Sequence, residues 1–190
     1  WYAVDHERRM SRIRELYGCT GAPNVGVQWE PAKVAREIRR MEEEDPNLHG
    51  KKIFGVADPA IWQSDGHESI GALMERERVY FEKGDHSRLP GKMQVHHRLS
   101  FDGDGVPMLY VFSTCKHFIR TVPNLVYDET DVEDIDTDGE DHIYDELRYV
   151  CMKNPISPRP QPVAKPRPYS PLDTDEDVRG YDRYEFFRKF

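Results

Sequence analysis

The chain has 190 residues, of which 33% are charged and 37% hydrophobic, and its net charge is -8. This length and composition fit one folded domain with a highly polar surface, followed by a tail. No run of about 18 apolar residues occurs, so no membrane span is predicted. The three cysteines are widely spaced and form no CxxC pair, which argues against a zinc site or a disulfide framework and favours a reducing compartment.

The first half of the chain begins with a predicted β-hairpin. Residues 1–4 and 11–17 are its strands, and they flank a polar stretch. The chain opens on Trp1, without Met and without a signal-peptide pattern, so we expect it to be part of a longer protein that is not secreted. The next elements are a helix over 30–44, a short buried strand over 52–57 (KIFGVA), a helix over 69–78 and a strand over 79–81.

The clearest of these elements is the helix over 30–44. Pro31 suits a first helical position, and the apolar residues repeat at helical spacing. The inward face is predicted to carry Val34, Ala35, Ile38 and Met41. In the weaker helix over 69–78, the inward residues are predicted to be Ile70, Leu73 and Met74.

The second half continues the alternation of helix and strand. We expect a helix with a basic, histidine-containing face over 90–99, a buried strand over 108–112 (MLYVF), a helix over 114–121 and a last helix over 139–152. The inner face of the last helix is predicted to carry Ile143, Leu147, Val150 and Cys151. This alternation predicts an α/β sheet with helices on its faces.

The C-terminal part has a different composition. Seven prolines fall within residues 155–171, which predicts an extended linker. We therefore divide the chain into a folded domain over 1–152 and a proline-rich linker and tail over 153–190. The final YDRYEFFRKF is either a docking peptide or a solvated end.

The negative charge is concentrated in one segment. Residues 1–126 hold 18 basic and 18 acidic side chains, whereas residues 127–146 (YDETDVEDIDTDGEDHIYDE) hold eleven Asp or Glu and no Lys or Arg. We call residues 127–146 the acidic run. Carboxylates at this density repel one another unless a cation or solvent lies among them. Since the rest of the chain is balanced, a polyanionic partner is not excluded.

Three aspartates are candidates for a metal site. Asp58 follows the predicted strand over 52–57, and ligands of α/β sheets bind beyond the carboxyl ends of strands. Asp141 and Asp145 lie one turn apart on the predicted last helix, where like charges need compensation. Carboxylate oxygens suit Mg²⁺ or Mn²⁺. The simpler alternatives are a turn cap for Asp58 and a solvated acidic face for the pair.

Other patterns are weaker. The segment from Asp134 through Asp136, Asp138 and Gly139 to Asp145 nearly matches a calcium loop, although Asp replaces Glu at its last position and no helix is predicted before it. His96 and His97 are either phosphate or metal contacts or ordinary surface histidines. Six basic residues are candidate phosphate contacts or ordinary surface charges, namely Lys83, Arg88, Lys92, Arg98, Lys116 and Arg120.

Four segments of the chain form a recognisable set: GVADPAIW (55–62), VYFEKGDHSRLPGKMQVHHRL (79–99), PMLYVFSTCKHFIRTVPNL (107–125) and DIDTDGEDHIYDELRYV (134–150). Together they resemble one known family, the C-terminal nuclease domain of the large subunit of tailed-bacteriophage terminases. The resemblance covers residues 1–152 and holds in the order of its motifs; beyond residue 152 it rests only on proline content.

The resemblance implies an RNase H-like fold, with a mixed central sheet flanked by helices. It implies an endonuclease that cuts concatemeric double-stranded DNA during genome packaging with two Mg²⁺ or Mn²⁺ ions. In this family three acidic residues hold the ions. Two of them map to Asp58 and Asp145, with Asp141 as an auxiliary ligand and Asp141 or His142 orienting water. The implied partners are DNA, a portal protein and a small terminase subunit in the host cytoplasm, with no membrane.

The chain also departs from the family. The acidic residue of the family's first strand precedes the segment that the start of this chain resembles, and Glu146 stands where a small residue is usual. We therefore expect the first strand to be missing and cleavage by this chain alone to be weak or absent. Two alternatives to a nuclease are a non-catalytic docking module for a portal or partner subunit and a calcium-binding loop protein.

Overall fold

The computed structural model describes residues 1–22, 25–64, 66–101, 105–129, 134–136 and 139–157. All of them belong to one compact unit, Trp1–Arg159. In chain order the elements of this part are β1 (Tyr2–Val4), β2 (Met10–Arg12), α1 (Pro31–Glu44), β3 (Gly55–Ala57), η1 (Pro59–Trp62), α2 (Ile70–Arg76), β4 (Phe81–Lys83), α3 (Arg88–Leu99), β5 (Leu109–Val111), α4 (Lys116–Thr121), η2 (Val122–Asn124) and α5 (His142–Lys153).

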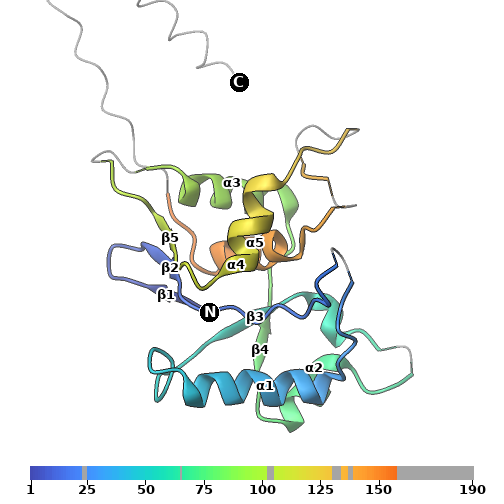
Figure 1. The fold of residues 1–190 in the computed structure, drawn as a ribbon. Coiled ribbons are helices and arrows are strands. Elements are labelled where there is room, and N and C mark those ends of the chain that lie inside the picture. Colours follow the sequence, from blue (N-terminus) through green and yellow to red (C-terminus); the bar gives the residue numbers. More distant parts are fainter. Residues whose placement is uncertain (23–24, 65, 102–104, 130–133, 137–138, 158–190) are drawn as a thin grey trace, which may run out of the picture. The chain divides into compact units, whose positions relative to one another are not determined.

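The described strands form two small sheets. In the first, β2 lies between β1, with which it is antiparallel, and β5, with which it is parallel. In the second, β3 and β4 are parallel, and Val56 lies opposite Glu82 (Figure 1). The structure therefore confirms a mixed α/β architecture, with a small mixed sheet flanked by helices.

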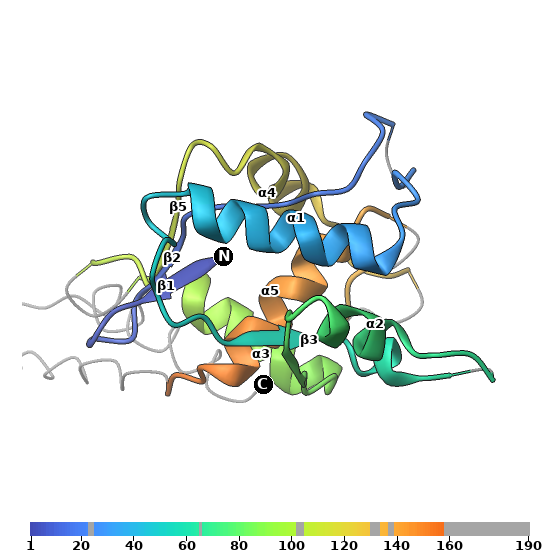
Figure 2. The ribbon, with the colours of Figure 1, turned by 90° about the horizontal axis from the view of Figure 1, so that it is seen from below.

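The helices pack in two groups. Helix α1 contacts α2 (Figure 2), and α5 contacts both α3 and α4. The approach of α3 to α5 is close at Gly91, because a Cβ atom there would lie 2.4 Å from Cγ of Arg148. Helix α5 also contacts β3, so it links the second sheet to the helices.

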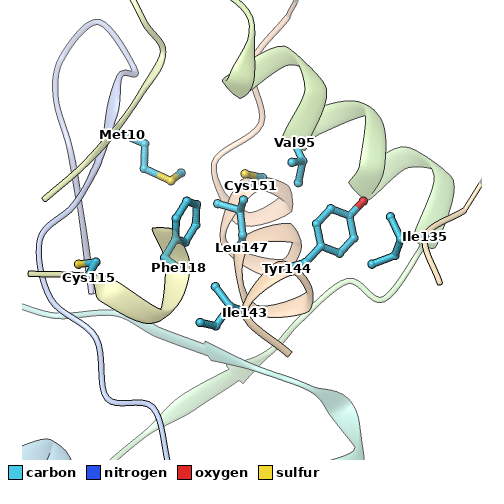
Figure 3. Close-up of a cluster of buried hydrophobic side chains, with 9 residues drawn as sticks. All are labelled: Met10, Val95, Cys115, Phe118, Ile135, Ile143, Tyr144, Leu147 and Cys151. Carbon is cyan, nitrogen blue, oxygen red and sulfur yellow. The ribbon is translucent and has the colours of Figure 1, made fainter. Parts of the chain in front are cut away.

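The hydrophobic core surrounds α5. As Figure 3 shows, the core side chains of α5 lie between Val95 of α3 on one side and Phe118 of α4 on the other. Leu147 and Cys151 of α5 and Met10 of β2 are fully buried. The cluster consists of Met10, Val95, Cys115, Phe118, Ile135, Ile143, Tyr144, Leu147 and Cys151. The core therefore fixes the position of α5, which carries two of the predicted site residues.

Most predicted elements are confirmed in type and order. The hairpin forms, the helix predicted over 30–44 is α1, and the helix predicted over 139–152 is α5, which begins three residues later. Residues 158–190, most of the predicted linker and tail, lie outside the described part of the chain.

Burial was predicted less well than element type. Phe54, before β3, is 69% exposed, and Tyr110 in β5 is 40% exposed. The reason for β5 is that the core covers one face of its sheet: Leu109 and Val111 pack against the core, so Tyr110 between them points outward. In α2, Ile70 is exposed, contrary to the prediction, whereas Leu73 and Met74 are half-buried and Gly71 is buried against Trp62.

Candidate metal-binding and nucleic-acid site

Asp58 lies at the carboxyl end of β3, and its two carboxylate oxygens have different partners. Oδ1 accepts a hydrogen bond from the backbone N–H of Ala60 at 2.7 Å, so Asp58 caps the 3-10 helix η1. Oδ2 accepts a hydrogen bond from the hydroxyl of Tyr149 on α5 at 2.6 Å. The bond from Tyr149, followed by that from Ala60, lowers the pKa of Asp58 below its usual range. The predicted turn cap is thus present, but it uses only one of the two oxygens.

Asp141 and Asp145 lie one turn apart at the start of α5, as predicted. Asp141 is the N-cap residue, yet its side chain makes no capping hydrogen bond. It is buried, and Nδ1 of the exposed His142 lies 3.6 Å from its Oδ1. Burial, followed by the negative charge of Asp145, raises the pKa of Asp141. This carboxylate therefore lacks full compensation of its charge by the protein.

Asp145 is held by an arginine from its own helix. Nη2 and Nε of Arg148 contact Oδ1 of Asp145 at 2.8 and 3.2 Å. Nη1 of Arg148 donates to the backbone carbonyl of His86 at 3.0 Å, and the whole arginine is 2% exposed. Within the described residues no donor contacts Oδ2 of Asp145, which leaves that oxygen for another ligand.

Asp58 is tied to α5, the helix that carries Asp145, through Tyr149. Tyr149, the partner of Asp58, is one helical turn after Asp145 and its pKa is raised to about 12 by burial, by the hydrogen bond to Asp58 and also by the charge of Asp145. The charge of Arg148, which holds Asp145, also lowers the pKa of Asp58. The structure thus brings a strand-end carboxylate and two helix-borne carboxylates to one helix.

Arginines neutralise much of the described acidic run. Arg120 on α4 binds Glu140 with both nitrogens, at 2.6 and 2.7 Å. Further pairs join Arg88 to Asp134, Arg148 to Asp145 and Arg12 to Glu146. The sequence-based choice between a cation and solvent was therefore incomplete, because guanidinium groups from other elements supply part of the positive charge. Asp141, by contrast, has no arginine partner among the described residues, and the side chain that lies within ion-pair distance of it is that of His142.

No closed metal cage exists in the described part of the chain. No group of three or more His, Cys, Asp or Glu side chains there is arranged to hold a metal ion. Mg²⁺, however, is usually bound by one or two protein carboxylates together with water and substrate phosphates. Asp58 keeps lone pairs on both oxygens and Asp145 keeps Oδ2 without a donor among the described residues, so these two side chains have the oxygen atoms that an open site of that kind needs.

The calcium loop fits less well. The carboxylate of Asp134, its first predicted ligand, is bound by Arg88, with Nη2 3.0 Å from Oδ1. Ile135, inside this segment, forms an isolated antiparallel bridge with Tyr127. The predicted ligand Asp138 lies outside the described residues.

The six candidate phosphate contacts differ in their surroundings. Lys83 and Lys116 are exposed, and Arg88 and Arg120 are each paired with a carboxylate of the acidic run. Arg98 does not fit the expectation of a surface contact. It is fully buried and donates to the backbone carbonyls of Arg8 and Asn154. Lys92 is also buried, with Nζ 4.6 Å from the centroid of the Tyr127 ring. The reason is that Lys92 and Arg98 lie on the buried face of α3, which packs on α5.

Sequence analysis missed Arg148, Tyr149 and the segment of Asp85 and His86. Asp58 directly follows β3, and Asp85 is the second residue after β4; since these strands are parallel, both aspartates lie at the same end of the sheet. Arg148 was recoverable, because Asp and Arg three positions apart on a helix are neighbours. Tyr149 had no comparable local signal.

None of the described helices is long and apolar enough to cross a membrane. Comparison of the chain with models of known families, with curated proteins and with solved structures finds no match.

Proposed function

We propose that this chain is an RNase H-like nuclease domain of a viral DNA-packaging terminase, which hydrolyses phosphodiester bonds of double-stranded DNA with divalent metal ions. The observation that carries the proposal is the hydrogen bond from Tyr149 to Asp58, because it ties the strand-end carboxylate to the helix of Asp141 and Asp145. The motif resemblance supports the same pair of residues. The implied partners remain a portal protein and a small terminase subunit in the host cytoplasm.

The three aspartates would have different roles in metal binding and proton transfer. Asp58 and Asp145 would hold Mg²⁺ or Mn²⁺, since Asp58 retains lone pairs on both oxygens and Asp145 retains Oδ2. A bound ion of this kind lowers the pKa of water and stabilises a leaving oxygen. Asp141 would orient and accept a proton from water, a role that suits a carboxylate with a raised pKa.

DNA would be held through its phosphates. The exposed Lys83 and Lys116 are the cations of the predicted set that are open to a polyanion, whereas Arg88 and Arg120 would first have to exchange a carboxylate for a phosphate. Contacts of this type position the duplex without reading its sequence. We therefore expect cleavage with little sequence preference.

The test is Mn²⁺ binding and DNA cleavage by variants of Asp58 and Asp145. Asp58→Asn and Asp145→Asn should each remove Mn²⁺ density from a soaked crystal and abolish Mn²⁺-dependent nicking of supercoiled plasmid by the intact terminase, while its ATPase activity remains. Glu75→Gln is the control, since Glu75 is exposed on α2. If nicking survives both aspartate substitutions, the site is not the nuclease centre.

A further inference from the structure

Helix α5 carries two adjacent side chains that each hold one of the proposed metal ligands. Arg148 binds Asp145, and Tyr149 binds Asp58. Arg148 acts within its own helix, whereas Tyr149 reaches a strand 91 positions earlier in the chain. Tyr149 is therefore the described side chain of α5 whose hydrogen bond ties Asp58 to the helix of Asp145.

Packing holds the Tyr149 ring in addition to the hydrogen bond of its hydroxyl. The residue is 7% exposed, and Cζ of Arg148 lies 5.1 Å from the ring centroid. Gly84, directly after β4, makes room for the ring: a Cβ atom at this position would lie 2.7 Å from Cδ1 of Tyr149 and 3.1 Å from the carbonyl oxygen of Ala57. The end of the β3–β4 sheet and the ring of Tyr149 are thus closely packed, which places the Tyr149 hydroxyl oxygen beside Asp58.

The hydrogen bond orients the carboxylate without using up its donor capacity. An ionised carboxylate has about four lone-pair positions, and the described contacts use one on each oxygen, from Ala60 and from Tyr149. The remaining lone pairs point away from these two donors. A carboxylate held at both oxygens in this way presents them to a cation without having to reorient, which is how outer partners strengthen metal binding.

We propose that Tyr149 is a positioning residue that holds Asp58 in the orientation required to bind a divalent cation. This inference rests on the proposed function, because it presumes that Asp58 is a metal ligand. It assigns Tyr149 no contact with the ion or with DNA.

The experiment is Mn²⁺ titration of the full 190-residue chain, followed by the electron paramagnetic resonance signal of free Mn²⁺, together with thermal unfolding in EDTA. Tyr149→Phe keeps the ring and removes the hydroxyl, so we expect Mn²⁺ affinity to fall by about tenfold or more with little change in melting temperature in EDTA. Tyr144→Phe is the matched control. Tyr144 is also buried on α5, but within the described residues its hydroxyl has no hydrogen-bond partner, so its loss should leave Mn²⁺ affinity unchanged.

Two results would overturn the inference alone. One is Mn²⁺ binding by Tyr149→Phe that equals the wild type while Asp58→Asn binds poorly. The other is an equal loss of affinity in Tyr149→Phe and Tyr144→Phe with a matching loss of melting temperature, which would indicate only a packing role. Mn²⁺ binding by Asp58→Asn that equals the wild type, or no binding by the wild type, would instead remove the proposed site and the role of Tyr149 with it.

Discussion

A single carboxylate, Asp141, shows the balance of forces in the site most directly. It begins α5, where a negative charge is favoured by the helix dipole, yet its pKa is raised by burial and by Asp145. The unfavourable effects are therefore larger than the favourable one. A carboxyl group whose folded-state pKa is raised costs stability that accumulates as the pH rises from the unfolded-state pKa through the folded-state pKa, and this cost is fully present above the folded-state pKa.

Replacing Asp141 with Asn should therefore stabilise the protein in EDTA. The substitution removes a like-charge pair one turn apart, which costs about 0.5 kcal/mol, and no capping hydrogen bond is lost. We expect a higher free energy of unfolding in urea at pH 7. Mn²⁺ should then stabilise the wild type more than Asp141→Asn, since the cation compensates the charge that the variant lacks. A variant that is less stable than the wild type in EDTA would show that the Asp141 charge is already well compensated.

At the scale of elements, Gly91 on α3 sets how closely α3 and α5 approach. A Cβ atom there would lie 2.4 Å from Cγ and 2.7 Å from Cδ of Arg148, which is buried and cannot move aside freely. Overpacking of this kind lowers the free energy of unfolding by about 1–3 kcal/mol, whereas the higher helix propensity of Ala than of Gly raises it by about 1 kcal/mol. A contact as close as 2.4 Å belongs in the upper part of that overpacking range, about 2–3 kcal/mol, so after the gain in helix preference we expect Gly91→Ala to be less stable by about 1–2 kcal/mol in urea unfolding.

The control for this prediction is Gly26→Ala. A Cβ atom at Gly26 meets only the carbonyl oxygen of Gly18, at 3.6 Å, which is an ordinary contact. This variant should unfold like the wild type. Equal stability of Gly91→Ala and the wild type would mean that α3 and α5 can separate slightly, in which case the position of Arg148 is less constrained than we infer.

The elements also show which parts of this structure are readable from sequence. Helix α1 follows from Pro31 and from apolar residues at helical spacing, and Asp58 was placed at a strand end by the polar stop after KIFGVA. Both signals are local. The bond of Asp58 to Tyr149 spans 91 positions and that of Arg88 to Asp134 spans 46, so neither could be inferred from spacing. The burial of Arg98 was missed for the same reason, because it depends on how α3 packs on α5.

At the scale of the whole molecule, several carboxylates in the described part of the acidic run are held by arginines, three of which lie on other elements and one, Arg148, on the same helix as its partner Asp145. Glu140 is the clearest member: its pKa is lowered to about 2 by the hydrogen bonds from Arg120 and from the Tyr17 hydroxyl, which lies 2.6 Å from Oε1. The pKa of Asp134 is also lowered, chiefly by Arg88. Carboxylates with lowered folded-state pKa values stabilise the fold above their unfolded values, and this stabilisation is lost as the pH falls through the folded-state pKa.

We therefore expect acid to unfold the protein as the pH falls from about 4.5, the ordinary pKa of Glu, to about 2. Glu140→Gln should lower stability at pH 7 and flatten the dependence of the free energy of unfolding on pH in that window by up to about 1.4 kcal/mol per pH unit, the equivalent of one proton. Urea unfolding at several pH values measures this slope. Glu75→Gln should keep the wild-type slope, because Glu75 is exposed and makes no ion pair within the described residues. Equal slopes for Glu140→Gln and the wild type would mean that the bonds from Arg120 and Tyr17 do not persist in solution, and that the acidic run is held to the rest of the fold less firmly than the structure indicates.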